Sequence, residues 1–237
     1  KDPNLTKTIL AVIMIPGNQA GPRKDVSERI GKPDFSKPHT NDFLTHYLHD
    51  ADFDPVLNCL RESGIDNSPE SKVKAVFIPS YLNGYDGIFN MHYYELLVGF
   101  DVTVCPSYYE PWGYTPMESL AFKIPTITTS LAGFGVWVNS TFGKLEKGVA
   151  VIDRNDDNDD QVIDDIAKRL LICSKRSSEE NAQARDKAYE ISRAALWPNF
   201  IKYYQIAYSH TLSKVFTRKE LYRNKQVIEH IPITREV

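Results

Sequence analysis

The chain has 237 residues, of which 42% are hydrophobic and 25% are charged, and its net charge is −3. This size and composition are typical of a globular protein with a sizeable core. The charge balance creates no basic field that would attract nucleic acid or anionic lipid, so we exclude both as partners.

The longest apolar run, residues 9–15, is too short to cross a bilayer, and we expect no membrane insertion. The opening KDPNLTK has neither an apolar core nor a starting methionine, so we expect it to be neither a signal peptide nor a natural translation start, and we interpret the chain as an excised piece. Cys59, Cys105 and Cys173 are widely spaced, which indicates reduced thiols in a cytoplasmic protein rather than a disulfide framework.

Short apolar runs predict strands at residues 8–16, 72–79, 100–106, 125–130 and 148–153. Helices are predicted from Asn41 or Asp42 past Cys59, and at residues 91–100, 115–122, 160–175 and 178–196. Because strands and helices alternate, we predict an α/β fold with a Rossmann-like, doubly wound parallel sheet.

Residues 17–40 are rich in Gly, Pro, Lys and Asp without a clear period, and we expect a loop or an ordered excursion there, which should be mobile. Residues 197–216 have apolar side chains at helical spacing, so a long final helix should pack against the sheet. Beyond Arg218 the chain should be charged and extended. We therefore assign residues 1–216 to one lobe and residues 217–237 to a C-terminal extension.

The segment PSYYEPWGYTPMES, residues 106–119, connects a predicted strand to a predicted helix, where open α/β sheets bind ligands. Thr115 and Glu118, spaced three apart around Pro116, match a capping box, which by itself would explain these residues. The alternative is that the helix start, with Gly113 and Tyr114 in a tight turn, binds a diphosphate through its free N–H groups.

Glu110 precedes this turn between aromatic and proline neighbours and has no evident structural role. Its spacing to Glu118, within SYYEPWGYTPMES, resembles the paired-glutamate motif of retaining GT-B glycosyltransferases, and specifically glycogen synthases of the animal and fungal type. Similar segments are KVKAVFIPSYL, THYLHDADFDPVL, SLAGFGVWV, GVAVIDR and LWPNFIKYYQIAYSHTLSKVF, so the resemblance covers roughly residues 8–216.

The resemblance implies that the chain is the nucleotide-sugar-binding lobe of a GT-B enzyme, and it implies a role for each matching residue. Glu110 would bind the sugar hydroxyls and stabilise the charge that develops as the donor bond breaks. Glu118 would reach the ribose. The remaining donor-binding residues would be Tyr81 and Tyr93 beside the base, Trp112, and the N–H groups near Gly113, Tyr114 and Thr115, which would bind the diphosphate without a metal or other cofactor.

Each of these roles has a simpler alternative. Tyr81 and Tyr93 could be ordinary core aromatics, and Trp112 could only shape the turn. The triplet Gly133-Phe134-Gly135 is too short for a dinucleotide-binding fingerprint and is interpreted as a tight loop.

The implied activity is transfer of glucose from a nucleotide sugar, with UDP-glucose as the expected donor, to the non-reducing end of an α-1,4-glucan with retention. The alternatives are a non-catalytic nucleotide-sugar or glucan-binding module, or a transferase with another donor, ADP-glucose included, or another acceptor. The family's N-terminal acceptor lobe and the Arg and Lys of its phosphate site have no counterpart here, so we expect the chain alone to be inactive and to bind UDP weakly.

Two further expectations follow from the departures from the family. Because the family's first strand–helix unit has no counterpart here, one strand edge should be exposed, and the chain should either self-associate into a homo-oligomer through that edge or rearrange its N-terminal strand. The family's arginine-rich regulatory helix keeps only Arg185, Lys187 and Arg193, so we expect no activation by glucose 6-phosphate.

Two segments have spacings that resemble metal sites, and a simpler interpretation explains each of them. His46 and His49 are three apart on a predicted helix, which is a ligand-like spacing, but a surface helix of mixed charge is commoner. Residues 153–165 partly mimic a calcium loop, yet acids before a helix N-terminus explain them better.

Overall fold

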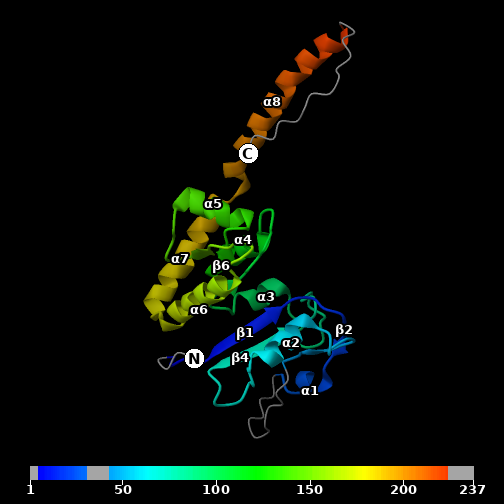
Figure 1. The fold of residues 1–237 in the computed structure, drawn as a ribbon, viewed down its shortest axis with the longest axis vertical. Coiled ribbons are helices and arrows are strands. Elements are labelled where there is room, and N and C mark those ends of the chain that lie inside the picture. Colours follow the sequence, from blue (N-terminus) through cyan, green and yellow to red (C-terminus); the bar gives the residue numbers. More distant parts are fainter. Residues whose placement is uncertain (1–4, 31–42, 224–237) are drawn as a thin grey trace. The chain divides into compact units, whose positions relative to one another are not determined.

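The computed structural model describes residues 5–30 and 43–223. The strands are β1 Ile9–Met14, β2 Gln19–Pro22, β3 His46–Leu48, β4 Val73–Ile78, β5 Thr103–Val104, β6 Thr126–Thr129 and β7 Val149–Ile152 (Figure 1). The helices are α1 Lys24–Ser27, α2 Pro55–Glu62, α3 Tyr93–Leu97, α4 Tyr114–Ala121, α5 Gly133–Phe142, α6 Asp159–Lys175, α7 Ser178–Ala194 and α8 Trp197–Arg223. Parallel strands alternate with helices, which confirms the predicted fold class.

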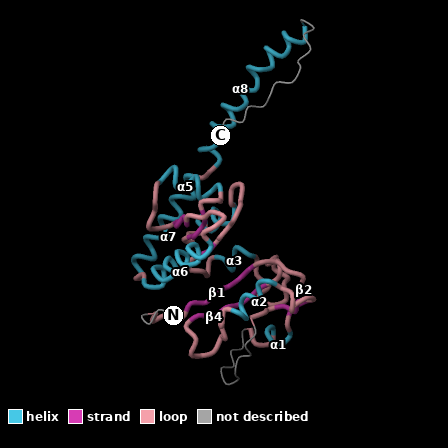
Figure 2. The backbone as a smooth tube through the Cα atoms, viewed as in Figure 1, coloured by secondary structure: helices cyan, strands magenta, loops and turns pink. Residues whose placement is uncertain are grey.

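The parallel strands fall into two groups. β1 pairs with β4 from Ile9↔Val73 to Met14↔Ile78, and β6 lies between β5 and β7. Within the described residues, β1 and β5 each have one parallel partner strand, whereas the sequence predicted a single doubly wound sheet. Long loops follow β4 and β5, and Figure 2 shows them as pink tube between the strands and helices.

Each group of strands has its own core. In the first group, buried Ala75 and Phe77 of β4 pack with Leu57 and Leu60 of α2. Against β6 and β7, Val162 of α6 packs with buried Ile127 and Ile152. Both cores come from apolar strand runs covered by one stripe of a helix, which is the packing that the periodicity predicted.

The predicted helix from Asn41 or Asp42 past Cys59 is wrong over its first half. Thr45 donates its N–H to the Phe77 carbonyl at 3.1 Å, and this part of the chain is extended and continues into β3. The helix, α2, begins only at Pro55, and the Asp54 carboxylate accepts the Leu57 N–H at 2.8 Å. A proline is tolerated at the first helical position but not in a helix interior, and here it marks the start.

The expected loop over residues 17–40 contains secondary structure in its described part. β2 pairs antiparallel with β3, and the short helix α1 follows β2. Residues 31–40 of that predicted loop lie outside the described residues. The antiparallel pair arises because the segment around β3 is extended, which the helical prediction for that segment concealed.

The chain divides into two compact units, residues 1–189 and 190–237. In the second unit, α8 confirms the predicted final helix but continues to Arg223, past the point where an extended chain was expected. Along it Trp197, Tyr204 and Tyr208 follow one another with ring centroids 5.3 and 6.3 Å apart. Its packing against the sheet and the boundary at residue 216 stay predictions.

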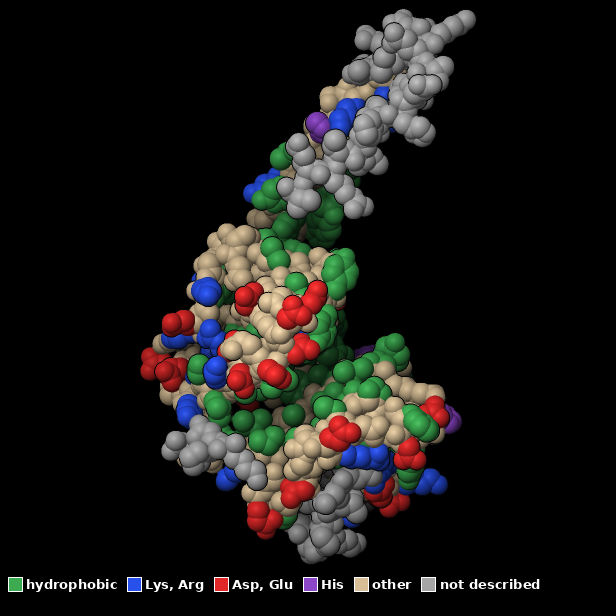
Figure 3. All heavy atoms as spheres, in the orientation of Figure 1, with side chains coloured by type: hydrophobic (Ala, Val, Ile, Leu, Met, Phe, Trp, Pro, Cys, Tyr) green, Lys and Arg blue, Asp and Glu red, His purple; other side chains and the backbone are tan. Residues whose placement is uncertain are grey.

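Basic and acidic side chains are interspersed over the face seen in Figure 3, in keeping with a net charge of −3. None of the helices in the described part of the chain has the length and apolar character needed to cross a membrane.

Candidate functional site

The candidate site lies at the carboxyl ends of β5, β6 and β7. These parallel strands end side by side, so the connections that follow them meet at one edge of the sheet. The connection after β5, residues 105–113, carries the predicted site residues Glu110, Trp112 and Gly113. Residues 130–132 lead from β6 to α5, and residues 153–158 lead from β7 to α6.

The connection after β5 is joined to the start of α5 by two backbone hydrogen bonds. The Gly133 N–H donates to the Glu110 carbonyl at 2.9 Å, and the Phe134 N–H donates to the Trp112 carbonyl at 2.6 Å. A Cβ at Gly133 would lie 2.2 Å from the Pro111 carbonyl oxygen, so only glycine allows this approach. The Gly133-Phe134-Gly135 triplet therefore begins a helix, and its interpretation as a tight loop is wrong.

Gly135 is required for a second close approach. A Cβ there would lie 2.2 Å from the Thr129 carbonyl oxygen at the end of β6. The two glycines of the triplet thus let α5 pack on the loop with one residue and on the sheet with the other.

Trp112 is half-buried in an aromatic cluster. Its ring lies 5.7 Å from that of Phe134 and 5.9 Å from that of Trp137, centroid to centroid. This packing fits the interpretation that Trp112 shapes the turn. A direct role for its ring in donor binding stays a prediction.

The start of α4 differs from the capping box that the sequence predicted. The N-cap is Gly113, with φ 104 and ψ 76, and no side chain caps the helix. Thr115 lies inside the first turn, where its carbonyl accepts the Ser119 hydroxyl at 3.0 Å. The left-handed conformation at residue 113 favours glycine, and it displaces the helix start by two residues from the expected one.

The two helix N-termini at this edge are used differently. The first N–H groups of α5 donate to the carbonyls of the loop. For α4, no hydrogen bond from the N–H of Gly113, Tyr114 or Thr115 is found within residues 5–30 and 43–223. The start of α4 is therefore the helix end that can accept an anion.

Glu110 lies in the loop before α4 and Glu118 lies within α4, and both are half-buried. A Cβ on Gly113 would lie 3.4 Å from Cγ of Glu110, so the Glu110 side chain runs along the glycine. Burial, and then the charge of Glu110, raise the pKa of the Cys105 thiol to about 11. Glu110 is thus close enough to its own strand end to affect a buried group there.

Glu118 faces α3. A hydrogen bond to the Glu118 carboxylate, followed by its charge, raises the pKa of Tyr94. Burial raises the pKa of Tyr93, with smaller contributions from Cys105 and Glu118. The structure therefore brings the predicted residues Glu110, Glu118 and Tyr93 to one place.

Tyr81 is 75% exposed on the loop after β4. The neighbouring Leu82 carbonyl accepts the Tyr93 N–H at 3.0 Å, so both predicted tyrosines belong to one folded segment. Its exposure rules out the alternative that Tyr81 is a core aromatic in this chain, and Tyr93 is only half-buried.

His46 and His49 do not lie on a helix as predicted, because His46 is in β3 and His49 in the turn after it. The His46 ring is fully buried, with Nε2 2.8 Å from the Asp86 carbonyl oxygen and Nδ1 2.9 Å from the Thr45 hydroxyl. Both ring nitrogens have protein partners, which accounts for this histidine without a metal. In the described ranges no group of three or more metal-ligating side chains is found.

Arg154 is a residue of this edge that sequence reasoning passed over. It follows β7 within an acidic run that we interpreted as solvated, yet it is only 8% exposed. The acids expected at the next helix start are present, with Asp159 and Asp160 in the first turn of α6. Its position could have indicated burial, because Arg154 lies only two residues after the apolar run GVAVI.

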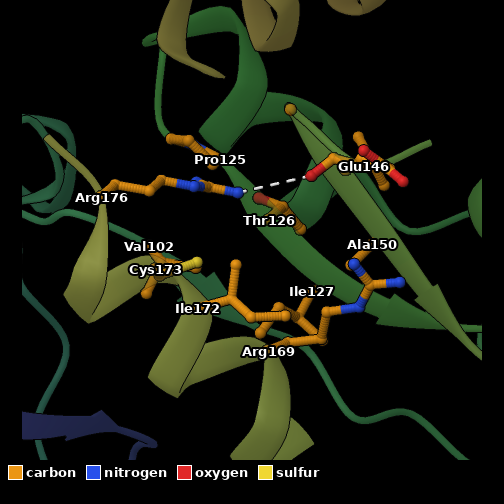
Figure 4. Close-up of a pocket in the computed structure, with 12 residues that line it drawn as sticks. Val102, Pro125, Thr126, Ile127, Glu146, Ala150, Arg169, Ile172, Cys173 and Arg176 are labelled. Atoms are coloured by element: carbon orange, nitrogen blue, oxygen red, sulfur yellow. Dashed lines mark hydrogen bonds between the residues drawn. The ribbon is translucent and has the colours of Figure 1, made fainter. Parts of the chain in front are cut away.

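A separate hollow lies at the opposite ends of the same strands (Figure 4). It encloses about 300 Å³, part of it open to solvent, between the starts of β6 and β7 and the last turns of α6. Arg169 and Arg176 lie at its rim, and Arg176 donates to the Glu146 carbonyl at 3.4 Å. None of the predicted site residues lines it.

Comparisons with known proteins show the family of the chain. The family model described as "Glycogen synthase" matches residues 36–234. The chain belongs to the glycogen synthase family. It is 33% identical over 176 residues to "Glycogen [starch] synthase, liver" of Homo sapiens, covering 74% of this chain and 25% of that protein.

Two other relatives show the same extent of similarity. "Glycogen [starch] synthase" of Caenorhabditis elegans is 34% identical over 68% of this chain and 24% of its own length. "Glycogen [starch] synthase isoform 2" of Saccharomyces cerevisiae is 31% identical over 65% of this chain and 22% of its own length. The solved structure titled "Crystal structure of GtfA/B complex" aligns with 89% of this chain and 37% of its own chain, at 13% identity and a TM-score of 0.46. The chain thus spans about a quarter of the length of the curated relatives it matches.

Proposed function

We propose that this chain is the nucleotide-sugar-binding lobe of a retaining glucosyltransferase, which transfers glucose from UDP-glucose to the non-reducing end of an α-1,4-glucan. The observation that supports this most is that Glu110, in the loop before α4, and Glu118, within α4, accompany a helix start whose first N–H groups have no hydrogen-bond partner among the described residues. A sugar diphosphate needs carboxylates for its hydroxyls and N–H groups for its phosphates, and this edge offers both.

In the proposed mechanism the start of α4 binds the diphosphate. The helix dipole and the N–H groups of Gly113, Tyr114 and Thr115 would stabilise the negative charge that the leaving group gains. Glu110 would accept hydrogen bonds from glucose hydroxyls and stabilise the positive charge that develops at the anomeric carbon. Glu118 would accept hydrogen bonds from the ribose, in exchange for its bond to Tyr94.

Tyr81 and Tyr93 would flank the base of the nucleotide. Tyr81 is exposed and Tyr93 half-buried, as a stacking ring and a ring that closes the site from the protein side should be. Two stacking rings would accept either uracil or adenine, so the choice between UDP and ADP is tested by the donor assay below.

Regulation by a sugar phosphate on α7 is not part of the proposal. The Arg185 guanidinium donates to the Phe100 carbonyl at 2.8 Å and to the Lys123 carbonyl at 3.5 Å. Lys187 lies 5.8 Å from the centroid of the Phe142 ring. Arg185 and Lys187, two of the three basic residues kept in this helix, therefore already have partners within the chain.

The test is an assay of the full-length protein that contains this chain, with UDP-glucose or ADP-glucose as donor and glycogen as primer. Glu110→Gln keeps the shape of the side chain but removes its charge, and we expect the turnover number to fall by about 100- to 1000-fold. Glu28→Gln, at an exposed glutamate of the α1 end, is the matched control and should keep full activity.

Three results would contradict the proposal in different ways. Full activity of Glu110→Gln would return Glu110 to a structural role. Incorporation from ADP-glucose alone would correct the donor. Incorporation from neither nucleotide sugar, in a protein that still binds one of them, would favour the alternative of a non-catalytic binding module.

A further inference from the structure

Arg154 contacts the loop that carries Glu110 at two points. Its Nη1 donates to the Pro106 carbonyl at 2.7 Å, and its guanidinium carbon lies 3.4 Å from the centre of the Tyr108 ring. Its Nη2 donates to the Asp159 carboxylate at 2.8 Å. One buried side chain therefore joins the connection after β5 to the first turn of α6.

The Tyr108 hydroxyl closes this arrangement, because it also donates to the Asp159 carboxylate. Arg154, Tyr108 and Asp159 thus each contact the other two. The backbone of Arg154 is held as well, since its N–H donates to the Ser130 hydroxyl at 2.9 Å. The Arg154 backbone is held at the end of β7, and the Arg154 side chain in turn holds the loop.

Other contacts hold the loop further along. The Thr129 hydroxyl donates to the Ser107 carbonyl at 2.7 Å, and the Gly133 N–H donates to the carbonyl of Glu110. Carbonyls at residues 106, 107 and 110 are therefore anchored by the ends of β7 and β6 and the start of α5. Arg154 is the one charged side chain among these anchors, and the carbonyl that it holds belongs to Pro106, four residues before Glu110.

The contacts of Arg154 argue against a direct role in binding phosphate. Both Nη groups already donate to protein acceptors, and the Nε–H finds no acceptor in the described part of the chain. Burying a guanidinium costs desolvation, so such a residue is a weak route to stability. What its planar fork and flat stacking provide is a defined geometry for the groups around it.

We propose that Arg154 is a positioning residue that holds residues 105–113 in the shape in which Glu110 faces the donor sugar. This rests on the proposed function only for the last step, the role of Glu110. The part that concerns the loop depends on contacts within this chain, and it can be tested without a substrate.

Cys105 reports on the loop, because it directly precedes Pro106 and its thiol senses both burial and the charge of Glu110. Alkylation rates of Cys59, Cys105 and Cys173 can be measured by peptide mass spectrometry on the 237-residue chain. In Arg154→Lys, which keeps the charge but loses the fork, Cys105 should react about tenfold faster at pH 8, because a loosened loop exposes the thiol and makes its ionisation easier. Cys59 and Cys173 should react as in the wild type, and the exposed control Arg29→Lys should change none of the three.

Tyr108→Phe is the second variant, in case Arg154→Lys does not fold. It keeps the ring against the guanidinium but removes the bond to Asp159, and it should raise the Cys105 rate by a smaller factor. An unchanged Cys105 rate in folded variants, or equal acceleration of all three thiols, would show that Arg154 has no specific hold on the loop and would overturn the proposal.

In the full-length protein, Arg154→Lys should lower the turnover number with UDP-glucose, whereas Arg29→Lys should not. If the wild type transfers no glucose while the Cys105 rates behave as expected, the proposed function fails and the positioning of the loop stands. If the wild type is active and Arg154→Lys is equally active, the link from Arg154 to Glu110 is refuted.

Discussion

Gly133→Ala tests the contact that joins the site loop to α5. The added Cβ would lie 2.2 Å from the Pro111 carbonyl oxygen and 3.0 Å from its carbonyl carbon, and both are backbone atoms that cannot rotate away. A carbon and an oxygen approach to about 3.3 Å in favourable contacts, so the loop or the helix must move by about 1 Å. A shift of that size also breaks the 2.9 Å hydrogen bond from the Gly133 N–H to Glu110.

The expected cost follows from three contributions. Overpacking in a closely packed region costs about 1–3 kcal/mol, and the lost hydrogen bond costs about 1 kcal/mol. Replacing glycine by alanine in a helix returns up to about 1 kcal/mol. We therefore expect Gly133→Ala to lower the free energy of unfolding by about 2–3 kcal/mol, measured by urea denaturation followed by circular dichroism.

Two glycine variants serve as comparisons. Gly99→Ala should change stability by less than about 1 kcal/mol, because the nearest atom to its Cβ, the Leu96 carbonyl oxygen, is 3.3 Å away. Gly135→Ala should cost as much as Gly133→Ala, since its Cβ meets the Thr129 carbonyl oxygen at 2.2 Å. A Gly133→Ala protein as stable as Gly99→Ala would refute the close approach of α5 to the loop.

Two further predictions concern a helix cap and the half-buried thiol of Cys105. Asp54→Ala should lower the free energy of unfolding by about 1 kcal/mol, because the acceptor of the Leu57 N–H is lost; Asp54→Asn should lose less in the same urea titration, and equal losses would contradict the capping role. The pKa of Cys105 is raised from 9.0 to about 11, so the preference of the fold for the neutral thiol is fully present below pH 9 and is lost as the pH rises towards 11. The difference in stability between pH 8 and pH 10.5 should therefore be smaller in Cys105→Ala than in the wild type, and an equal difference would refute the assignment.

Periodicity was a good guide where one stripe or one run faces a single core. The strand runs that became β1, β4, β6 and β7 were located from their apolar residues alone, and the helices α6 and α7 agree with prediction within two residues at each end. Such elements bury one continuous surface, so the pattern of apolar residues is sufficient to find them.

Periodicity misled where backbone pairing determines the conformation. The segment before Asp54 has helix-compatible side chains, but Thr45 pairs with Phe77 of β4, and that partner is 32 residues away. A strand of this kind is stabilised by a neighbour that local sequence does not show. The predicted capping box failed for a related reason, because the left-handed Gly113 starts the helix before Thr115 can cap it.

For the candidate site, the motif located the acids and the tertiary structure supplied the reasons for their surroundings. Glu110, Glu118 and Tyr93 were named from the sequence, and the charge of Glu110 acts on Cys105 while those of Cys105 and Glu118 act on Tyr93. Arg154 was missed because charged residues in a loop are usually solvated, and only the packing of three strand ends shows that this one is buried.

By itself the sequence determined the alternation of strands and helices, the strand end at which we place the candidate site, and the family to which the chain belongs. These properties depend on local residue patterns, which a linear chain displays. Which helix start remains open to an anion, why glycines occupy residues 133 and 135, and what holds the Glu110 loop were decided only by tertiary structure. The hydrogen bonds that Gly133, Phe134 and Arg154 donate to the loop join atoms 2.6–2.9 Å apart across segments distant in sequence, and such contacts exist only once the strands have brought their ends together.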